Sequence, residues 1–140
     1  MRIFLDANVL VSVLNKEYPL FSYSSRIVSL ADNKDFEVYT SPLCLAIAFY
    51  FAEKKNKKTA REKIGLLAKY LSISPISENG VKKTVANTST HDFEDGLEYY
   101  GAMESKCKCI ITEDVDDFYF SDIEVLTCQH FFEKYLVKKK

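Results

Sequence analysis

The stretch Arg2–Leu10, which reads RIFLDANVL, decides the fold. The short apolar run Arg2–Leu5 predicts a buried strand at the start of the chain. Asp6–Asn8 then predicts the turn into a helix, because Asp and Asn side chains accept hydrogen bonds from the first amides of a helix, which lack other partners. Val9 and Leu10 begin an apolar stripe at helical spacing. The chain therefore opens with a strand that leads directly into a helix.

The rest of the chain repeats this alternation of short strands and helices. Further strands are predicted at 37–40, 71–74, 109–112 and 124–127, and helices at 22–33, 42–54, 59–70, 77–87, 92–105 and 128–137. Such alternation indicates a parallel sheet that is covered on both faces. The predicted fold class is therefore α/β, a three-layer α/β/α sandwich around a central, mainly parallel sheet of four to five strands. The segment 42–54 is apolar nearly all round, so we expect that helix to be deeply buried.

Length and composition bound the class of protein. A chain of 140 residues fits one domain, which we expect to span 1–137, followed by a basic tail at 138–140. The longest apolar stretch, Leu43–Ala52, is too short to cross a membrane. Asp6 stands where a signal peptide would need an apolar residue. The sequence therefore predicts a cytoplasmic protein without a membrane partner.

Charge and cysteine usage leave one question open. The net charge of −1 gives the whole chain no attraction to nucleic acid. The basic run at 53–61 and the tail at 138–140 are either solvated surface or contacts to a phosphate backbone. The spacing of the cysteines does not fit a zinc site, so we expect reduced thiols in the core. These cysteines are Cys44, Cys107, Cys109 and Cys128.

Acidic residues stand where the predicted strands end. Asp6 follows the first strand, Asp114 and Asp117 follow the strand at 109–112, and Asp95 lies in the first turn of the helix that leads into that strand. Open parallel sheets place their sites beyond the carboxyl ends of the strands, near the point where strand order reverses. Carboxylates that converge there repel one another unless a cation lies between them, and hard oxygen ligands select Mg²⁺ or Mn²⁺. The alternative for each acid is a structural role, as a helix cap or a turn former.

Three segments together resemble the motifs of PIN domains. The segment 4–10 resembles their opening, an apolar strand that runs into Asp-x-Asn and two apolar residues. The segment 92–102 is similar to their third motif, in which an aspartate opens a helix with small residues on one face. The segment 110–118 resembles their fourth motif, an apolar strand followed by Thr-x-Asp and later Asp-Phe. The resemblance covers nearly the whole chain, from about residue 3 to residue 126.

The resemblance implies a function and a set of site residues. PIN domains are mostly Mg²⁺- or Mn²⁺-dependent ribonucleases, and many small bacterial ones are toxins of toxin–antitoxin pairs, often dimeric and inhibited by a small antitoxin. Their pattern implies carboxylates that face the metal ion used for RNA cleavage, together with two supporting side chains. By this carry-over the metal-facing residues are Asp6, Asp95 and Asp114 with Asp117 as a fourth acid, while Asn8 steadies the first carboxylate and Thr112 lines the site.

One departure from the family pattern keeps a second function open. The second PIN motif usually places a glutamate early in the helix after the second strand, a position that falls at or beside Ile47 here. The alternative to a nuclease is therefore a catalytically degenerate PIN-fold module that binds RNA or a protein. A phosphoacceptor receiver domain is a third candidate, but such a domain requires paired acids after the first strand, and Asp6–Asn8 does not provide them. His91, just before the third motif, is either a substrate contact or a surface or capping residue.

Overall fold

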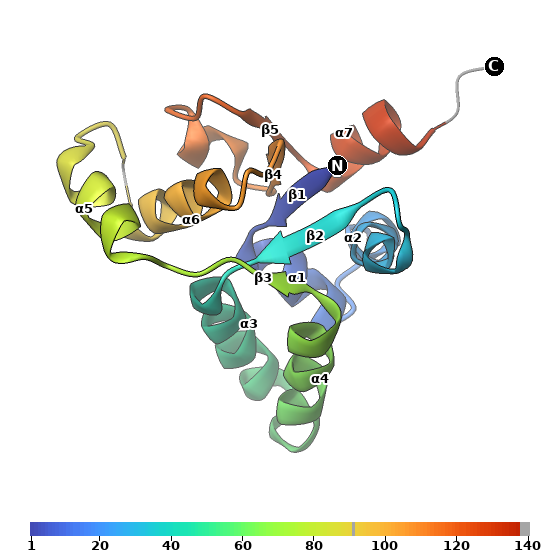
Figure 1. Ribbon diagram of the computed structural model, residues 1–140. Helices are drawn as coiled ribbons and strands as arrows, with labels where there is room; N and C mark the ends of the chain where they lie inside the picture. Colours follow the sequence, from blue (N-terminus) through green and yellow to red (C-terminus); the bar gives the residue numbers. More distant parts are fainter. Residues whose placement is uncertain (91, 138–140) are drawn as a thin grey trace.

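The computed structural model describes residues 1–90 and 92–137, and its centre is a five-stranded sheet. All four strand pairings are parallel, in the order β3-β2-β1-β4-β5 (Figure 1). The strands are β1 (Arg2–Leu5), β2 (Glu37–Thr40), β3 (Ser72–Ile73), β4 (Cys109–Ile111) and β5 (Glu124–Leu126). The expected α/β class with a mainly parallel sheet of four to five strands is confirmed.

The two central strands form the middle of the core. Ile3–Leu5 of β1 and Cys109–Ile111 of β4 have no exposed side-chain surface. Their continuous apolar sequence is the pattern of strands that are covered on both faces. Phe4 lies opposite Tyr39 of β2 on one side and Ile110 of β4 on the other. The predicted strand at the start of the chain is thus the central strand of the sheet.

Helices cover both faces of the sheet. They are α1 (Ala7–Leu14), α2 (Phe21–Val28), α3 (Pro42–Lys55), α4 (Lys57–Tyr70), α5 (Glu78–Ala86), α6 (Phe93–Glu104) and α7 (Cys128–Phe131). Figure 1 shows α5 and α6 packed together on one side of the sheet, and α1 and α2 on the other. Helices α3 and α4 form a hairpin that projects from the sheet, with α3 packed against α1. This is the three-layer arrangement that the alternating elements predict.

Side-chain caps fix where the helices α1 and α3 begin. Asp6 has an extended backbone, and its carboxylate accepts a hydrogen bond from the Ala7 amide at the start of α1. Ser41 accepts a hydrogen bond of 3.1 Å from the Cys44 amide, and Pro42 occupies the first position of α3. Both caps follow from the sequence, because each side chain provides an oxygen to amides that lack helical partners.

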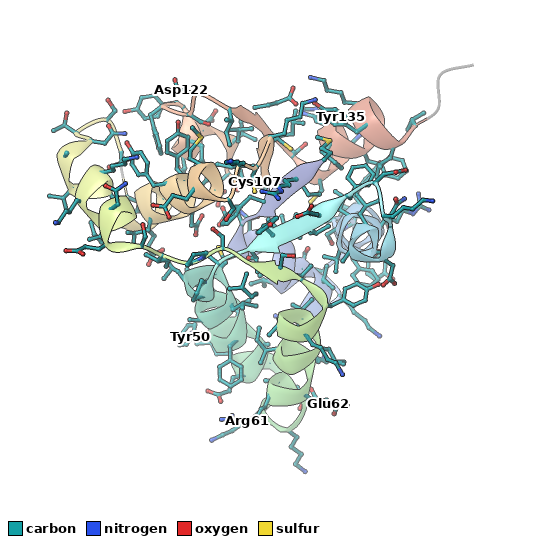
Figure 2. All side chains as sticks on the ribbon, viewed as in Figure 1. Tyr50, Arg61, Glu62, Cys107, Asp122 and Tyr135 are labelled. Atoms are coloured by element: carbon teal, nitrogen blue, oxygen red, sulfur yellow. The ribbon has the colours of Figure 1, made fainter. Side chains whose placement is uncertain are left out.

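The expectation that the helix at 42–54 is deeply buried is wrong. Only Cys44, Ala48 and Ala52 of α3 are buried, whereas Tyr50 and Phe51 are 53% and 45% exposed. Figure 2 shows Tyr50 on the outer part of the α3–α4 hairpin, which also carries Arg61 and Glu62. The hairpin extends beyond the sheet, so only one face of α3 meets α1 and α4. A sequence that is apolar all round cannot show which face remains uncovered.

The bounds of three further elements differ from the predicted ones, and two predictions concern residues that the structure does not describe. The strand predicted at 71–74 is reduced to the two residues of β3, at the edge of the sheet. The helix predicted at 22–33 ends as α2 at Val28, and the chain continues as a 3-10 turn, Ser29–Asp32. The helix predicted at 128–137 begins as α7 and changes into a π-helical turn, Phe132–Leu136. His91 and the tail at 138–140 lie outside the described residues.

Two simpler expectations can be compared directly with the structure. All four cysteines are free and buried, as the prediction of reduced core thiols requires. Within residues 1–90 and 92–137, no helix has the length and apolar character needed to cross a bilayer.

Candidate metal centre

The candidate site lies between the carboxyl ends of β1 and β4, where the strand order reverses. Leu5 pairs with Ile111 at the ends of these strands, and the Asp6 amide donates a hydrogen bond of 3.0 Å to the Ile111 carbonyl. The chain leaves β1 toward β2 and leaves β4 toward β5, on the opposite side. Such a reversal opens a crevice beyond the strand ends. The residues that follow the two strands, Asp6 and Thr112, are therefore neighbours.

Two hydrogen bonds hold the Asp6 carboxylate in one orientation. Asp6 is only 7% exposed. Its Oδ1 accepts a hydrogen bond of 2.7 Å from the Ala7 amide, and its Oδ2 accepts one of 2.8 Å from the Thr112 hydroxyl. A buried carboxylate that is fixed in this way can present its remaining lone pairs in a constant direction.

Thr112 and Asn8 connect Asp6 to the acidic turn after β4. The Thr112 hydroxyl accepts hydrogen bonds of 3.0 Å from the Asn8 side-chain amide and from the Asp114 backbone amide. Asn8 Nδ2 also donates to Asp114 Oδ2 at 3.1 Å, and Asn8 Oδ1 accepts from the Glu113 amide at 3.2 Å. The two side chains that sequence reasoning selected as supporting residues thus lie between Asp6 and Asp114.

Asp95 reaches the same crevice from the first turn of α6. Burial, followed by the negative charges of Asp6, Asp117, Asp92 and Glu94, raises the pKa of its carboxyl to about 7. Nearby like charges favour the protonated form of a carboxyl, and Asp95 lines the same cleft as Asp6 and Asp117. Asp6 and Asp117 are the two strongest of these neighbours. The structure therefore brings Asp6, Asp95 and Asp117 together.

These residues line a common cleft of about 420 Å³. The cleft is strongly acidic, because many carboxylates line it and none of its described lining residues is a lysine or an arginine. Asp114 is exposed and Asp117 half-buried at its edge. Its acidic lining residues are Asp6, Glu17, Asp92, Glu94, Asp95, Glu98, Asp114 and Asp117. Every aspartate that sequence reasoning named as metal-facing is among them.

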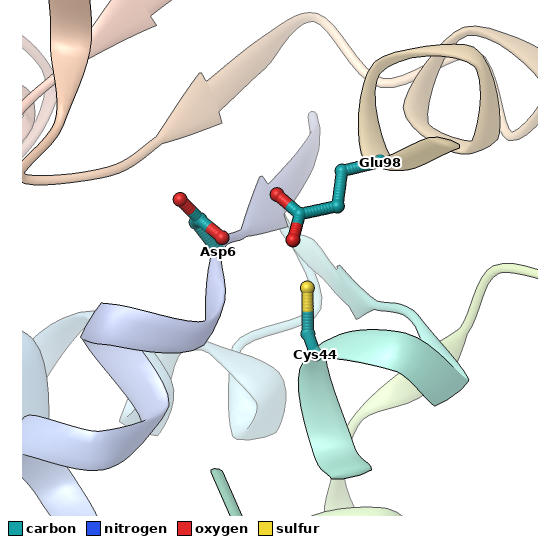
Figure 3. A group of neighbouring side chains, drawn as sticks. All are labelled: Asp6, Cys44 and Glu98. Carbon is teal, nitrogen blue, oxygen red and sulfur yellow. The ribbon is translucent and has the colours of Figure 1, made fainter. Parts of the chain in front are cut away.

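Glu98, one helical turn beyond Asp95, is an acid of this cleft that the sequence interpretation missed. Its side chain is 2% exposed, and its Oε2 atom has no hydrogen-bond partner. One ligand atom each of Asp6, Cys44 and Glu98 lies within 4.8 Å of the others, and Figure 3 shows the three side chains pointing toward one another. Burial, followed by the charge of Asp6, raises the pKa of Glu98 well above its usual range.

Helix α3 contributes a thiol and an apolar side chain instead of an acid. Cys44 is fully buried, and burial raises the pKa of its thiol, with smaller contributions from Glu98 and Asp6. Ile47, one turn later, also lines the cleft, at or beside the position where the resemblance to PIN domains predicts a glutamate.

The residues present fit a hard divalent cation. Carboxylate oxygens are the ligands that Mg²⁺ and Mn²⁺ prefer. The cleft concentrates such oxygens, and Glu98 Oε2 is buried without the hydrogen bond that a buried carboxylate needs. A cation between Asp6 and the acids of α6 would satisfy that oxygen and relieve the mutual repulsion.

Comparison with known proteins identifies the family. A profile of the PIN domain matches residues 2–116. Ribonuclease VapC1 of Aquifex aeolicus (strain VF5) is 30% identical over 138 residues, which cover 96% of this chain and 95% of that protein. This chain is a PIN domain of the VapC toxin group. The resemblance to PIN domains inferred from the three sequence motifs is thereby confirmed.

Solved structures share the PIN fold at lower sequence identity. VapBC2 from Rickettsia felis, bound to a DNA fragment from its promoter, matches with a TM-score of 0.69 at 21% identity, over 90% of this chain and 97% of that one. VapC20 from Mycobacterium tuberculosis, a toxin that cleaves the sarcin–ricin loop, gives 0.69 at 14% identity, over 88% and 98%. FitAcB from Neisseria gonorrhoeae gives 0.63 at 16% identity, over 91% and 99%. At these identities the likeness concerns the fold.

Proposed function

We propose that this PIN domain is a Mg²⁺- or Mn²⁺-dependent endoribonuclease and the toxin of a toxin–antitoxin pair. The observation that carries the proposal is the convergence of Asp6, Asp95, Asp114 and Asp117 in one cleft at the switch point of the sheet. The similarity over nearly the full length of a VapC ribonuclease supports it. In this assignment the four aspartates are the metal-facing residues, and Asp6, Asp95 and Asp114 are the catalytic ones.

The chain's own residues provide position and charge for phosphodiester hydrolysis. A bound divalent cation would lower the pKa of a water molecule and offset negative charge on the phosphoryl oxygens. Asp6 is fixed for this task by the Ala7 amide and the Thr112 hydroxyl. Asn8 holds the Asp114 carboxylate through its side-chain amide. Such hydrogen bonds to metal-facing carboxylates orient them and keep them in a constant geometry.

Contacts to the RNA backbone would come from the α3–α4 hairpin, since the cleft itself is acidic. Part of the basic run is occupied: Lys55 donates to the Asn15 carbonyl, and Lys63 donates at 3.2 Å to the Leu14 carbonyl, at the end of α1. Lys57, Lys58 and Arg61 are exposed. We assign these three cations to phosphate contacts, which bind RNA without reading its sequence.

The same hairpin carries apolar side chains that suit a protein partner. Tyr50 and Phe51 on α3 and Leu66 and Tyr70 on α4 are 42–63% exposed. Aromatic side chains are enriched at protein–protein contacts. We propose that these exposed side chains of the hairpin serve contacts with a small antitoxin and with a second copy of the chain in a homodimer. The neighbours described as VapBC2 and FitAcB support the assignment of an antitoxin partner.

Cleavage of a mixed single-stranded RNA panel in Mn²⁺ tests the nuclease. Wild type, Asp6→Asn and Asp95→Asn should be compared, with EDTA as the metal-free control and circular dichroism to show that each protein is folded. We expect metal-dependent cleavage by wild type and a loss of at least 100-fold in each variant.

The second candidate is a degenerate PIN module that binds RNA or protein without cleavage. The observation that favours it is Ile47, an apolar side chain at the cleft where the family pattern has a glutamate. It predicts that folded wild-type protein does not cleave RNA with Mg²⁺ or Mn²⁺. It also predicts that Asp6→Asn binds RNA as wild type does.

A further inference from the structure

Packing alone does not explain why the carboxyl group of Glu98 is buried. Glu98 is only 2% exposed, on the face of α6 that also carries Asp95. The Oε2 atom is without a hydrogen-bond partner, and no lysine or arginine lines the cleft in the described part of the chain. The closest ionisable groups are the carboxyl of Asp6 and the thiol of Cys44. A side chain held for packing alone would not bring one carboxylate against another.

The geometry around Glu98 is that of a ligand set. Asp6, Cys44 and Glu98 come from the carboxyl end of β1, from α3 and from α6, and their side chains point toward one another (Figure 3). One ligand atom of each lies within 4.8 Å of the other two, a separation that a single cation can bridge. Asp6 is held by the Thr112 hydroxyl and the Ala7 amide, so it is already oriented toward this point.

We propose that Glu98 supplies from α6 the carboxylate that α3 lacks, and that Asp6, Glu98 and Cys44 together hold a divalent cation with preference for Mn²⁺ over Mg²⁺. Ile47 and Glu98 line the same cleft from α3 and α6. The assignment deepens the proposed nuclease function, because it names a metal ligand of that same site.

The preference for Mn²⁺ follows from the thiol. Mg²⁺ demands oxygen ligands in near-ideal octahedral geometry, whereas softer first-row metals accept sulfur more readily. Cys44 Sγ is the third atom of the cluster and has no exposed surface. A site with two carboxylates and one sulfur therefore discriminates against Mg²⁺ more strongly than a site built from carboxylates alone.

Metal binding by the full chain tests this assignment directly. Mn²⁺ affinity is measured from the electron paramagnetic resonance signal of free Mn²⁺, and Mg²⁺ affinity from its competition with Mn²⁺. We expect Glu98→Gln to weaken Mn²⁺ binding at least tenfold. The matched control is Glu94→Gln, an exposed acid of the same helix and cleft, which should change the affinity less than threefold. Cys44→Ser should reduce the preference for Mn²⁺ over Mg²⁺ at least threefold.

A rescue variant separates a ligand from a structural residue. In Ile47→Glu combined with Glu98→Gln, the carboxylate returns to α3, and Mn²⁺ affinity should recover to within about threefold of wild type. Thermal melting without metal shows whether each variant is folded. Wild-type Mn²⁺ affinity in Glu98→Gln, or an equal loss in Glu94→Gln, would overturn the assignment.

The outcome for Glu98 can be told apart from the outcome for the nuclease. If Glu98→Gln binds Mn²⁺ as wild type does while wild type cleaves RNA, the nuclease stands and the Glu98 site is wrong. If Glu98→Gln loses Mn²⁺ and the double variant regains it while wild type cleaves no RNA, the metal site stands and the nuclease is wrong.

Discussion

The Thr112 hydroxyl donates a hydrogen bond of 2.8 Å to Asp6 Oδ2, across the point where β4 and β1 end. The oxygen of this Thr112 hydroxyl also accepts hydrogen bonds from the Asn8 side-chain amide and from the Asp114 backbone amide. One hydroxyl therefore links the acid after the first strand to the acidic turn after the fourth. The relationship joins residues 106 positions apart and depends on the parallel register of the two strands.

Thr112→Val should weaken the metal site and the fold together. The variant keeps the shape of the side chain but leaves the Asn8 amide and the Asp114 amide without their acceptor. We expect Mn²⁺ affinity to fall by about 10- to 100-fold. The free energy of unfolding should fall by about 1–3 kcal/mol, because the buried Asp6 carboxylate and two part-buried donors lose a partner. Titration with Mn²⁺ and urea denaturation measure the two effects, with Thr112→Ser as the control that keeps the hydroxyl.

The stability of the metal-free protein should fall as the pH rises. The pKa of Asp95 is about 7 in the folded protein, against an ordinary value of 3.8. The folded state therefore holds a proton between about pH 4 and pH 7 that the unfolded state has released, and stability decreases with pH over that range. Urea denaturation in EDTA at pH 5 and pH 8 measures the difference.

Asp95→Asn should reduce this pH dependence, since the amide does not titrate, while Glu98, whose pKa is also raised, should retain part of it. Asp92→Asn, an exposed neighbour in the same cleft, serves as the matched control and should keep most of the slope. A slope that is unchanged in Asp95→Asn would show that other groups cause it. Saturating Mn²⁺ should offset the slope in wild type, because a cation replaces the proton between the carboxylates.

Glu98→Gln should make the metal-free protein more stable, although it weakens metal binding. The amide removes a buried carboxyl that faces Asp6 without a partner for Oε2. We expect an increase of about 1–3 kcal/mol in the free energy of unfolding at pH 8 in EDTA. Urea denaturation measures it. A decrease in stability would instead indicate that Glu98 is held by favourable contacts and contributes to the fold.

Gly96→Ala should destabilise the protein by about 1–3 kcal/mol. Gly96 follows Asp95 in α6, and a Cβ there would overlap Thr84 Cγ2 of α5 and approach Thr90 Cγ2 to 3.2 Å. Thr84→Ser removes the overlapping methyl group and keeps the hydroxyl that donates to the Gly80 carbonyl, so it should recover part of the loss. Thermal unfolding measures both variants.

Gly65→Ala is the matched control for this substitution. Gly65 lies in α4 with no atom within 4 Å of a Cβ, so alanine should stabilise the helix by about 0.5–1 kcal/mol. Equal effects of the two substitutions would contradict the close packing of α5 against α6.

Sequence reasoning located Asp6 because its position depends on a strand end, whereas the roles of Asn8 and Thr112 were predicted from the resemblance to PIN domains. A residue that directly follows a buried parallel strand lies at the site edge of the sheet, whatever the rest of the chain does. The caps at Asp6 and Ser41 were predictable for a similar reason, since helix starts need side-chain oxygens. The inferences about Asp6 and the two caps need only local sequence and the parallel topology.

Residues that depend on packing between helices were harder to find. Glu98 stands three residues after Asp95, a spacing that places both on one helix face, and this was the signal that could have revealed it. Nothing in the sequence says that this face meets Cys44 across the cleft, because α3 and α6 are far apart in the chain. The exposure of Tyr50 escaped prediction for the same reason, since it depends on how far the α3–α4 hairpin extends beyond the sheet.

The measurement that tests the central claim most directly is Mn²⁺-dependent cleavage of single-stranded RNA by wild type, Asp6→Asn and Asp95→Asn. The account predicts cleavage by wild type that EDTA abolishes and that falls at least 100-fold in each variant while the fold is retained. Equal cleavage by wild type and both variants would show a contaminating nuclease, and no cleavage by folded wild type with either metal would contradict the nuclease. The latter result would leave a PIN module whose cleft binds without hydrolysis.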